Sequence, residues 1–135
     1  MDESPKNIDA ITLFVEDLDR SKHFYSDVFG LSVSYEDEDS AVFKFQHTMI
    51  NLLKIPAARD LVAPGVVADQ RAGSRFQLTV FVADVDAACA DLKTRGVKLQ
   101  NGPMDRPWGI RTASFTDSSG HLWEFAQPLP PKRAD

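Results

Sequence analysis

The residue best suited to binding or catalysis is Glu124, a carboxylate that lies between Trp123 and Phe125 near the end of the chain. Neighbouring side chains of a β-strand point to opposite faces, so Leu122 and Ala126 share a face with Glu124 and the two aromatic residues take the other. A charge on a half-buried strand serves as a metal ligand, as the partner of an arginine or as a solvent-facing group. We expect Glu124 to face a cleft, where it would bind a ligand or act catalytically as a general base.

Arg111 lies on the neighbouring predicted strand and offers a guanidinium that could bind an anionic group of a ligand through two hydrogen bonds. The competing interpretation is a structural ion pair with Glu124 or Asp117, which would also compensate a buried carboxylate. The single cysteine, Cys89, falls on the apolar stripe of a predicted helix, where a buried and inert thiol is expected. His121 follows a turn glycine and is expected to be partly exposed.

Aromatic side chains are the other candidate ligand contacts, because aromatic-lined pockets hold flat organic molecules without a metal. Trp108 lies in a loop flanked by Pro107 and Gly109, and it could line the mouth of a pocket. Trp123 could stack on a ligand, or it could pack in the core against a helix. Phe43 and Phe45 share one face of a predicted strand, which is most often the core, although a cavity-lining role stays open.

An internal repeat organises these residues into two halves. Residues 14–19 (FVEDLD) recur as residues 81–86 (FVADVD), at an offset of 67 residues (81 − 14 = 67). After each copy, apolar residues continue at helical spacing until a glycine, Gly30 or Gly96. Asp17 and Asp84 are placed to act as N-caps. The pattern therefore predicts one amphipathic helix in each half.

Each predicted helix is preceded by one strand and followed by three, so both halves have the order β-α-β-β-β. Alternating apolar residues and turn motifs place the strands at residues 8–15, 31–35, 41–45, 49–53, 76–82, 97–99, 110–115 and 121–125. The extra residues of the second half are expected in a loop at 100–107. Within a single domain of residues 1–135, the modules then span about 8–55 and 75–127, joined by a linker at 56–74 and followed by a tail at 128–135.

Composition excludes several classes of partner. The chain has 135 residues, of which 43% are hydrophobic, which is enough for one domain with its own core. A net charge of −5 argues against a nucleic-acid binder, which needs a basic face, and favours attraction of cationic compounds. The apolar runs are too short for a membrane span, and a lone cysteine suits a reducing cytoplasm.

The complete pattern resembles the vicinal oxygen chelate superfamily, which includes glyoxalase I, extradiol dioxygenases, fosfomycin-resistance enzymes and bleomycin-resistance proteins. The resemblance runs from about residue 8 to residue 127, and its carriers are the two repeat copies with their helices, Val28-Phe29-Gly30-Leu31, Trp108-Gly109-x-Arg111 and Phe115-x-Asp117-x-x-Gly120-His121-x-Trp123-Glu124. It implies an α+β fold in which two βαβββ modules form an open, eight-stranded, barrel-like sheet with a concave cavity. It also implies a homodimer with the pocket at or near the subunit interface.

In the metal-dependent members of this superfamily, each module supplies one ligand from its first strand and one from its last, usually His, Glu or Gln. Carried over by position, these sites are Ala10 and Gln77 (77 − 10 = 67) and Asn51 and Glu124 (124 − 51 = 73). The alanine has no donor atom, and one carboxylate with two amides is a poor site for a transition metal. We therefore expect no cofactor; a divalent metal held by Glu124, Gln77 and Asn51 is the alternative.

The resemblance and the residues together leave two functions. The favoured one is a metal-independent binding protein of the glyoxalase/bleomycin-resistance type, which holds an organic ligand such as an antibiotic or a toxic compound in an aromatic-lined cleft. Its expected contacts are Asn51, Gln77, Trp108, Arg111, Phe43, Phe45 and Trp123. The alternative is a lyase, isomerase or dioxygenase that uses Glu124 around a weakly held metal, or Glu124 alone as a general base.

Overall fold

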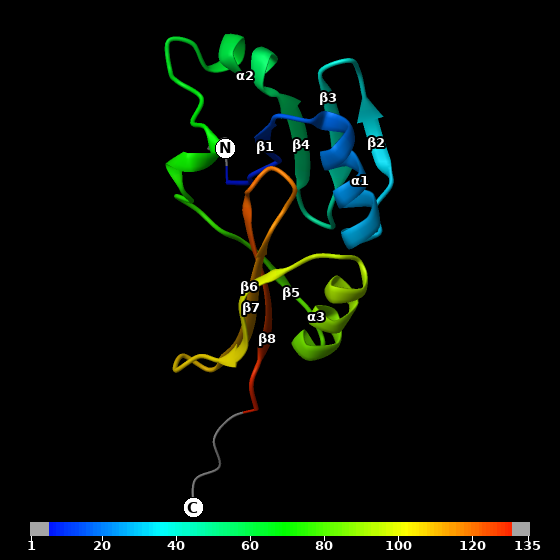
Figure 1. Cartoon of the computed structure of the whole chain (residues 1–135), viewed down its shortest axis with the longest axis vertical. Helices are drawn as coiled ribbons and strands as arrows, with labels where there is room; N and C mark the ends of the chain where they lie inside the picture. Colours follow the sequence, from blue (N-terminus) through cyan, green and yellow to red (C-terminus); the bar gives the residue numbers. More distant parts are fainter. Residues whose placement is uncertain (1–5, 131–135) are drawn as a thin grey trace, which may run out of the picture. The chain divides into compact units, whose positions relative to one another are not determined.

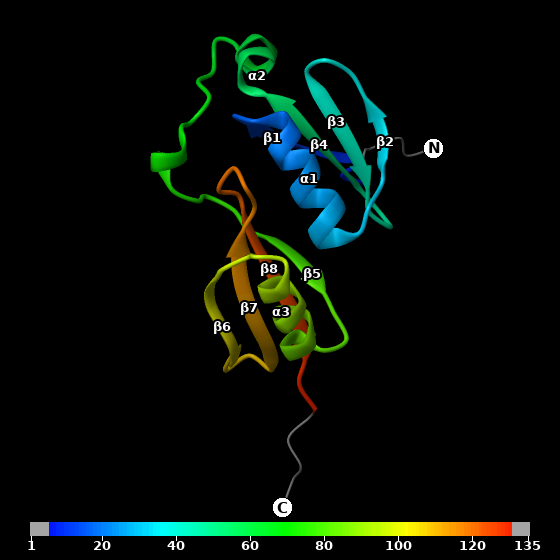
Figure 2. The same cartoon turned by 45° about the vertical axis from the view of Figure 1, so that its right-hand side comes forward.

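The computed structural model describes residues 6–130, and the chain consists of two compact units divided between Asp69 and Gln70. Both units have the predicted β-α-β-β-β order (Figures 1 and 2). Module 1 comprises β1 (Ala10–Val15), α1 (Leu18–Phe29), β2 (Val33–Glu36), β3 (Ser40–Lys44) and β4 (Met49–Lys54). Module 2 comprises β5 (Leu78–Phe81), α3 (Val85–Thr94), β6 (Leu99–Asp105), β7 (Ile110–Thr116) and β8 (Leu122–Pro128).

Within the described residues, the strands form two mixed sheets of four strands with the same topology, β1-β4-β3-β2 and β5-β8-β7-β6. The first and last strands of each module pair in parallel, and the other pairs are antiparallel. This arrangement confirms the α+β class and the two βαβββ modules. The joining of the sheets into one barrel-like surface with a concave cavity stays a prediction, as does the homodimer.

Both helices begin and end where the repeat predicts. The Asp17 carboxylate accepts a hydrogen bond from the Arg20 backbone N–H at 3.1 Å, and Asp84 accepts one from the Ala87 N–H at the same distance. Gly30 follows α1 with a φ of 65°, a left-handed conformation that costs a glycine little. An aspartate N-cap and a C-terminal glycine act within one turn of the helix, which is why the sequence could predict the helix ends.

The core of module 1 lies between α1 and one face of its sheet (Figure 1). The Tyr25 ring of α1 contacts the Phe43 ring of β3 at 5.7 Å between centroids, and both side chains are fully buried. The Phe29 ring lies 5.4 Å from Phe45, which follows β3. Phe43 and Phe45 therefore share a face as expected, and that face is the one covered by the helix.

Module 2 repeats this arrangement, with α3 over one face of its sheet (Figure 2). Val85 and Cys89 of α3 pack with Ala113 of β7 in one buried cluster. Trp123 and Phe125 of β8 are buried as well, and the register places Phe125 opposite Ala113. Ala113 of β7 and Phe125 of β8 therefore face the helix, and the residues on either side of each point to the other face of the sheet.

The segment between the modules has secondary structure of its own. The predicted linker at 56–74 contains the helix α2 (Ile55–Val62) and a short 3₁₀ turn (Gln70–Ala72). Pro56 occupies the first turn of α2, where a missing N–H costs no helical hydrogen bond. The helix ends before Pro64, because the residue preceding a proline disfavours helical geometry.

None of the helices in residues 6–130 is long and apolar enough to cross a membrane.

One expectation is corrected: the segment 100–107, expected to form a loop, continues β6 as far as Asp105. The extra residues of module 2 are absorbed by irregular pairing with β7, since the register shifts between Leu99 and Asn101 and again between Asn101 and Met104. Gly102 lies within this stretch at a φ of 84° and lets the backbone approach β7 closely.

Candidate functional site

Asn51 and Glu124 lie on the face of their sheets that points away from the helix, which we call the open face. In module 2, Ala113 packs against α3, so Thr112 and Ser114 point to the open face. Ser114 is the register partner of Glu124, which places Glu124 on the same face. The open face of module 2 thus presents Thr79, Phe81, Thr112, Ser114, Glu124 and Ala126.

Glu124 is held by one neutral hydrogen bond on this face. Thr79 is its register partner on β5, and the Thr79 hydroxyl donates to the Glu124 Oε1 at 3.0 Å. The other oxygen, Oε2, has no hydrogen-bond partner among residues 6–130, and no lysine or arginine of that range pairs with the carboxylate. Glu124 is half-buried.

Module 1 carries the equivalent pair. Asn51 of β4 is the register partner of Thr12 on β1, and its Nδ2 donates to the Thr12 Oγ1 at 3.4 Å. The Asn51 Oδ1 is buried and has no partner among the described residues. The two threonines are repeat equivalents (79 − 12 = 67), and sequence reasoning missed them although the matching residue type at the repeat offset was visible.

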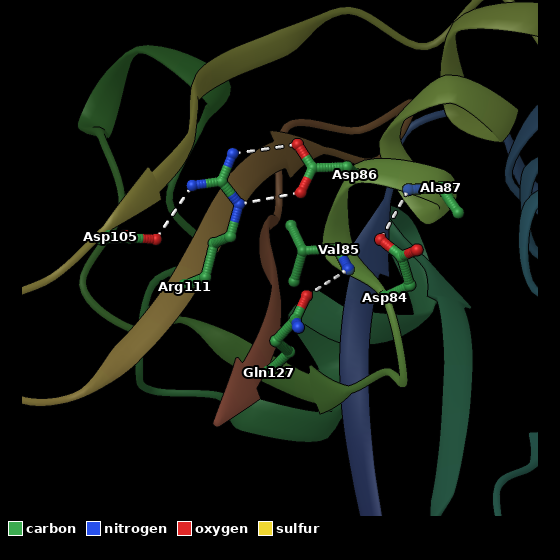
Figure 3. A network of polar contacts seen from close by, with 7 residues as sticks. All are labelled: Asp84, Val85, Asp86, Ala87, Asp105, Arg111 and Gln127. Carbon is green, nitrogen blue, oxygen red and sulfur yellow. Dashed lines mark hydrogen bonds and ion pairs between the residues drawn. The ribbon is translucent and has the colours of Figure 1, made fainter. Parts of the chain in front are cut away.

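Arg111 lies on the opposite face, and its predicted pairing with Glu124 or Asp117 is wrong (Figure 3). Its Nε and Nη2 donate to the two carboxylate oxygens of Asp86 on α3 at 2.8 and 2.9 Å, and its Nη1 donates to Asp105 at 2.9 Å. The guanidinium hydrogen bonds lower the pKa of Asp86, and the two carboxylates raise the pKa of Arg111. Side chains alternate between the two faces along β7, so Arg111 shares the helix-covered face with Ala113, whereas Glu124 lies on the open face with Ser114.

The same network fixes the start of α3 on the sheet. Gln127 of β8 accepts a hydrogen bond from the Val85 backbone N–H at 2.7 Å through its Oε1, next to the Asp84 cap (Figure 3). Backbone N–H groups of a first helical turn lack partners within the helix, so a side-chain acceptor stabilises them. Arg111 and Gln127 therefore attach α3 to the sheet, and the anion-binding role expected for Arg111 stays a prediction.

Trp108 lies at the turn between β6 and β7 and is 68% exposed. Its ring stacks with Arg106, whose Cζ lies 5.9 Å from the ring centroid. Arg106 in turn donates from Nε to the Thr112 hydroxyl at 2.9 Å and from Nη2 to the Asn101 Oδ1 at 3.3 Å. Because Thr112 points to the open face, this arginine belongs to the same face as Glu124. Sequence reasoning passed over Arg106, since nothing local distinguishes it from Arg111.

Three of the aromatic candidates lie beneath the helices. Phe43 has no exposed surface and Trp123 is 3% exposed, while Phe45 packs against Phe29. Core packing, the alternative interpretation for these residues, agrees with this burial; the ligand contacts expected of them stay predictions.

His121 is half-buried, as expected, and its Nδ1 lies 2.9 Å from a carboxylate oxygen of the buried Asp117. That carboxylate also accepts from the Ser119 and His121 backbone N–H groups and so shapes the β7–β8 turn. The thiol of Cys89 is buried, and burial raises its pKa.

Comparison with known proteins decides the family. A sequence profile of the Glyoxalase/Bleomycin resistance protein/Dioxygenase superfamily matches residues 7–125. The chain belongs to this superfamily. It is 35% identical over 123 residues to the uncharacterized protein YraH of Bacillus subtilis (strain 168), a match that covers 88% of this chain and 96% of YraH.

Solved structures of other proteins share the fold. A glyoxalase/bleomycin resistance protein/dioxygenase from Nocardioides superposes with a TM-score of 0.83 at 24% identity, covering 98% of this chain and 89% of that one. TnmS3, an antibiotic binding protein from Streptomyces sp. CB03234, superposes with a TM-score of 0.72 at 24% identity, covering 94% and 99%. At these identities the likeness concerns the fold alone.

The residues at the superfamily's metal-ligand positions fit a metal poorly. Ala10 ends in a methyl group, and Asn51 is hydrogen-bonded to Thr12. Gln77 lies just before β5 and is exposed, and no hydrogen bond within the described part of the chain joins it to Glu124. One carboxylate with two neutral amides does little to offset the dehydration of a divalent cation. Residues 6–130 also contain no cluster of three or more His, Cys, Asp or Glu side chains suited to a metal.

Proposed function

We propose that the protein is a metal-independent small-molecule binding protein that holds an organic ligand against the open face of module 2. The observation that carries the proposal is the state of Glu124. Its Oε1 is fixed by Thr79, its Oε2 is free of partners within residues 6–130, and no cation of that range compensates its charge. A ligand that donates a hydrogen bond to Oε2 would supply the missing partner, and a bond to a charged acceptor is stronger than a neutral one.

Further polar and aromatic groups support the same role. In module 1, the Asn51 Oδ1 is a separate buried acceptor without a partner in the described residues. Trp108 offers an exposed ring for stacking, and Gln77 offers an amide beside β5. A few directional polar groups beside an aromatic surface are typical of sites for small organic molecules.

The superfamily membership supports an antibiotic or another toxic organic compound as the ligand class. TnmS3, which shares the fold, is described as an antibiotic binding protein. In this role the protein would sequester such a compound. Binding at the open face of module 2 requires neither a metal nor a covalent step.

A second candidate function uses the same carboxylate as a general base. A base needs one oxygen held in position and another available to a substrate proton, and Glu124 has both within its module. A lyase or isomerase reaction would then proceed by proton transfer to Oε2, with Thr79 orienting the carboxylate.

Melting curves of chelator-stripped protein test both functions. The curves are recorded alone, with Mn²⁺, Fe²⁺, Ni²⁺, Co²⁺ or Zn²⁺, and with a panel of aromatic antibiotics and metabolites. A compound at ~100 times its Kd adds about 2.7 kcal/mol of stability, which raises Tm by several degrees. We expect a compound-dependent rise in Tm that disappears in Glu124→Gln and persists in the control Glu38→Gln, whose side chain lies on an exposed turn.

Three outcomes would contradict the binding proposal. A saturable metal-dependent rise in Tm that Glu124→Gln abolishes would favour a metal enzyme. A compound whose effect is the same in wild type and Glu124→Gln would remove Glu124 from the site. Chemical turnover of a bound compound, followed by mass spectrometry and lost in Glu124→Gln, would select the general-base function.

A further inference from the structure

Two arginines flank the β6–β7 turn, and their partners differ. Arg111 takes both nearby carboxylates, Asp86 and Asp105, on the face covered by α3. Among the described residues, Arg106 has neutral partners only, namely the Thr112 hydroxyl, the Asn101 side-chain Oδ1 and the Trp108 ring. Within residues 6–130, no carboxylate forms an ion pair with Arg106. On the open face of module 2, its guanidinium therefore has no direct ion pair with a carboxylate of the described residues.

The Arg106 side chain is not needed to close the turn. The Arg106 backbone N–H donates to the Ile110 carbonyl at 2.7 Å, and the Gly109 N–H donates to the Arg106 carbonyl at 3.1 Å. These backbone bonds define the turn whatever side chain residue 106 carries. The three neutral contacts instead hold the guanidinium in one orientation, which lowers the entropy lost when a partner binds.

We infer that the open face of module 2 recognises an aromatic organic anion, with Arg106 as the anchor of its negative group. The inference rests on the proposed small-molecule function and names the class of ligand. A guanidinium held by neutral groups gains a charge-assisted hydrogen bond when a carboxylate arrives, which is the strongest interaction available to it. Trp108, stacked beside Arg106, supplies a surface for the ligand ring.

The strand register sets the spacing of the ligand's polar groups. Arg106 is bonded to Thr112, and Ser114, two residues further along β7, is the register partner of Glu124. Two residues of a strand span about 7 Å, so Thr112, which binds the Arg106 guanidinium, and Ser114, which lies beside Glu124, are about that far apart along β7. The ligand therefore carries an anionic group at one end and a hydrogen-bond donor, such as a phenolic hydroxyl, at the other. This local arrangement overrides the preference for cations suggested by the net charge of −5.

Three compounds that differ at one group test the inference: 4-hydroxyphenylacetate, its neutral amide and the cation tyramine. Binding is measured by titration calorimetry and by tryptophan fluorescence. We expect the acid to bind at least about tenfold more tightly than the amide, and Arg106→Met to abolish that preference without weakening the amide. Arg106→Lys should keep part of the preference, which excludes misfolding as the cause. The control Arg95→Met removes an arginine paired with Asp91 on α3 and should change nothing.

Fluorescence adds a readout of position. The chain has two tryptophans, of which Trp123 is buried and Trp108 is exposed. A fluorescence change on binding the acid should be lost in Trp108→Phe.

Equal affinity for the acid, the amide and tyramine, or an unchanged preference in Arg106→Met, would overturn the inference and leave the proposed function standing. Binding of none of the three at millimolar concentration would also overturn it. The proposed function falls only if the wider panel yields no Glu124-dependent ligand either.

Discussion

Replacement of Gly102 by alanine tests how closely β6 approaches β7. Gly102 has a φ of 84°, where an L-residue is strained. A Cβ at this position would press against the Thr112 carbonyl oxygen and lie 2.8 Å from the Ala113 Cα. Both are backbone atoms of a paired strand, so neither can move aside by a rotamer change.

The matched control is Gly109→Ala in the same hairpin. Gly109 has a φ of 90°, but a Cβ there would meet nothing within 4 Å. The left-handed conformation costs either alanine about 1–2 kcal/mol. Only Gly102→Ala adds a steric cost, which for overpacking is about 1–3 kcal/mol. The entropy that glycine contributes to the unfolded chain cancels in the comparison.

The assay is urea unfolding of both variants, followed by far-ultraviolet circular dichroism. We expect Gly102→Ala to lower the free energy of unfolding by about 2–5 kcal/mol and Gly109→Ala by about 1–2 kcal/mol. A difference between the variants below about 0.5 kcal/mol, the usual error of additivity, would refute the close approach of the two strands.

Three further variants or conditions report on other parts of the fold. Phe43→Ala should cost about 3–5 kcal/mol of unfolding free energy, because its ring is fully buried against α1; a ligand-lining role would instead lower compound affinity without that cost. Arg111 lowers the pKa of Asp86 below its ordinary 3.8, so this pair should stabilise the fold fully above pH 3.8 and lose its effect as the pH falls through the lowered pKa. Urea titrations between pH 6 and pH 2 should therefore show a shallower acid loss in Asp86→Asn than in wild type, and identical curves would contradict the pairing. Cys89 should react with a thiol reagent much more slowly in native protein than in urea, because it is buried and its pKa is raised, and equal rates would show an exposed thiol.

The elements that sequence predicted well are those set by local rules. Asp17 and Asp84 were identified as caps, and Gly30 as a helix stop, because each acts within one helical turn. The repeat then located the second module from the first, although only a short segment of it is nearly identical. The face of Glu124 also followed from alternation with Trp123.

The partners of the candidate site residues depended on register, which composition does not reveal. Thr79 bonds Glu124 because β5 and β8 pair with those residues opposite each other. A pairing of Arg111 with Glu124 or Asp117 was one interpretation, since the strands of Arg111 and Glu124 are neighbours. The register pairs Arg111 with Gln127 and Ser114 with Glu124, so the side chains of Arg111 and Glu124 lie on opposite faces. The same alternation along β7 puts Thr112 on the open face, and Arg106 lies on that face because it donates to the Thr112 hydroxyl.

Strand β8 connects the two sides of its module. Glu124 points to the open face, and three residues later Gln127 holds the first turn of α3 through the Val85 N–H. A compound bound at Glu124 would restrain a strand whose other face carries the helix. Deuterium exchange at the Val85 amide should therefore slow when a compound binds, so this backbone proton would act as a remote sensor of occupancy on the far side of the sheet.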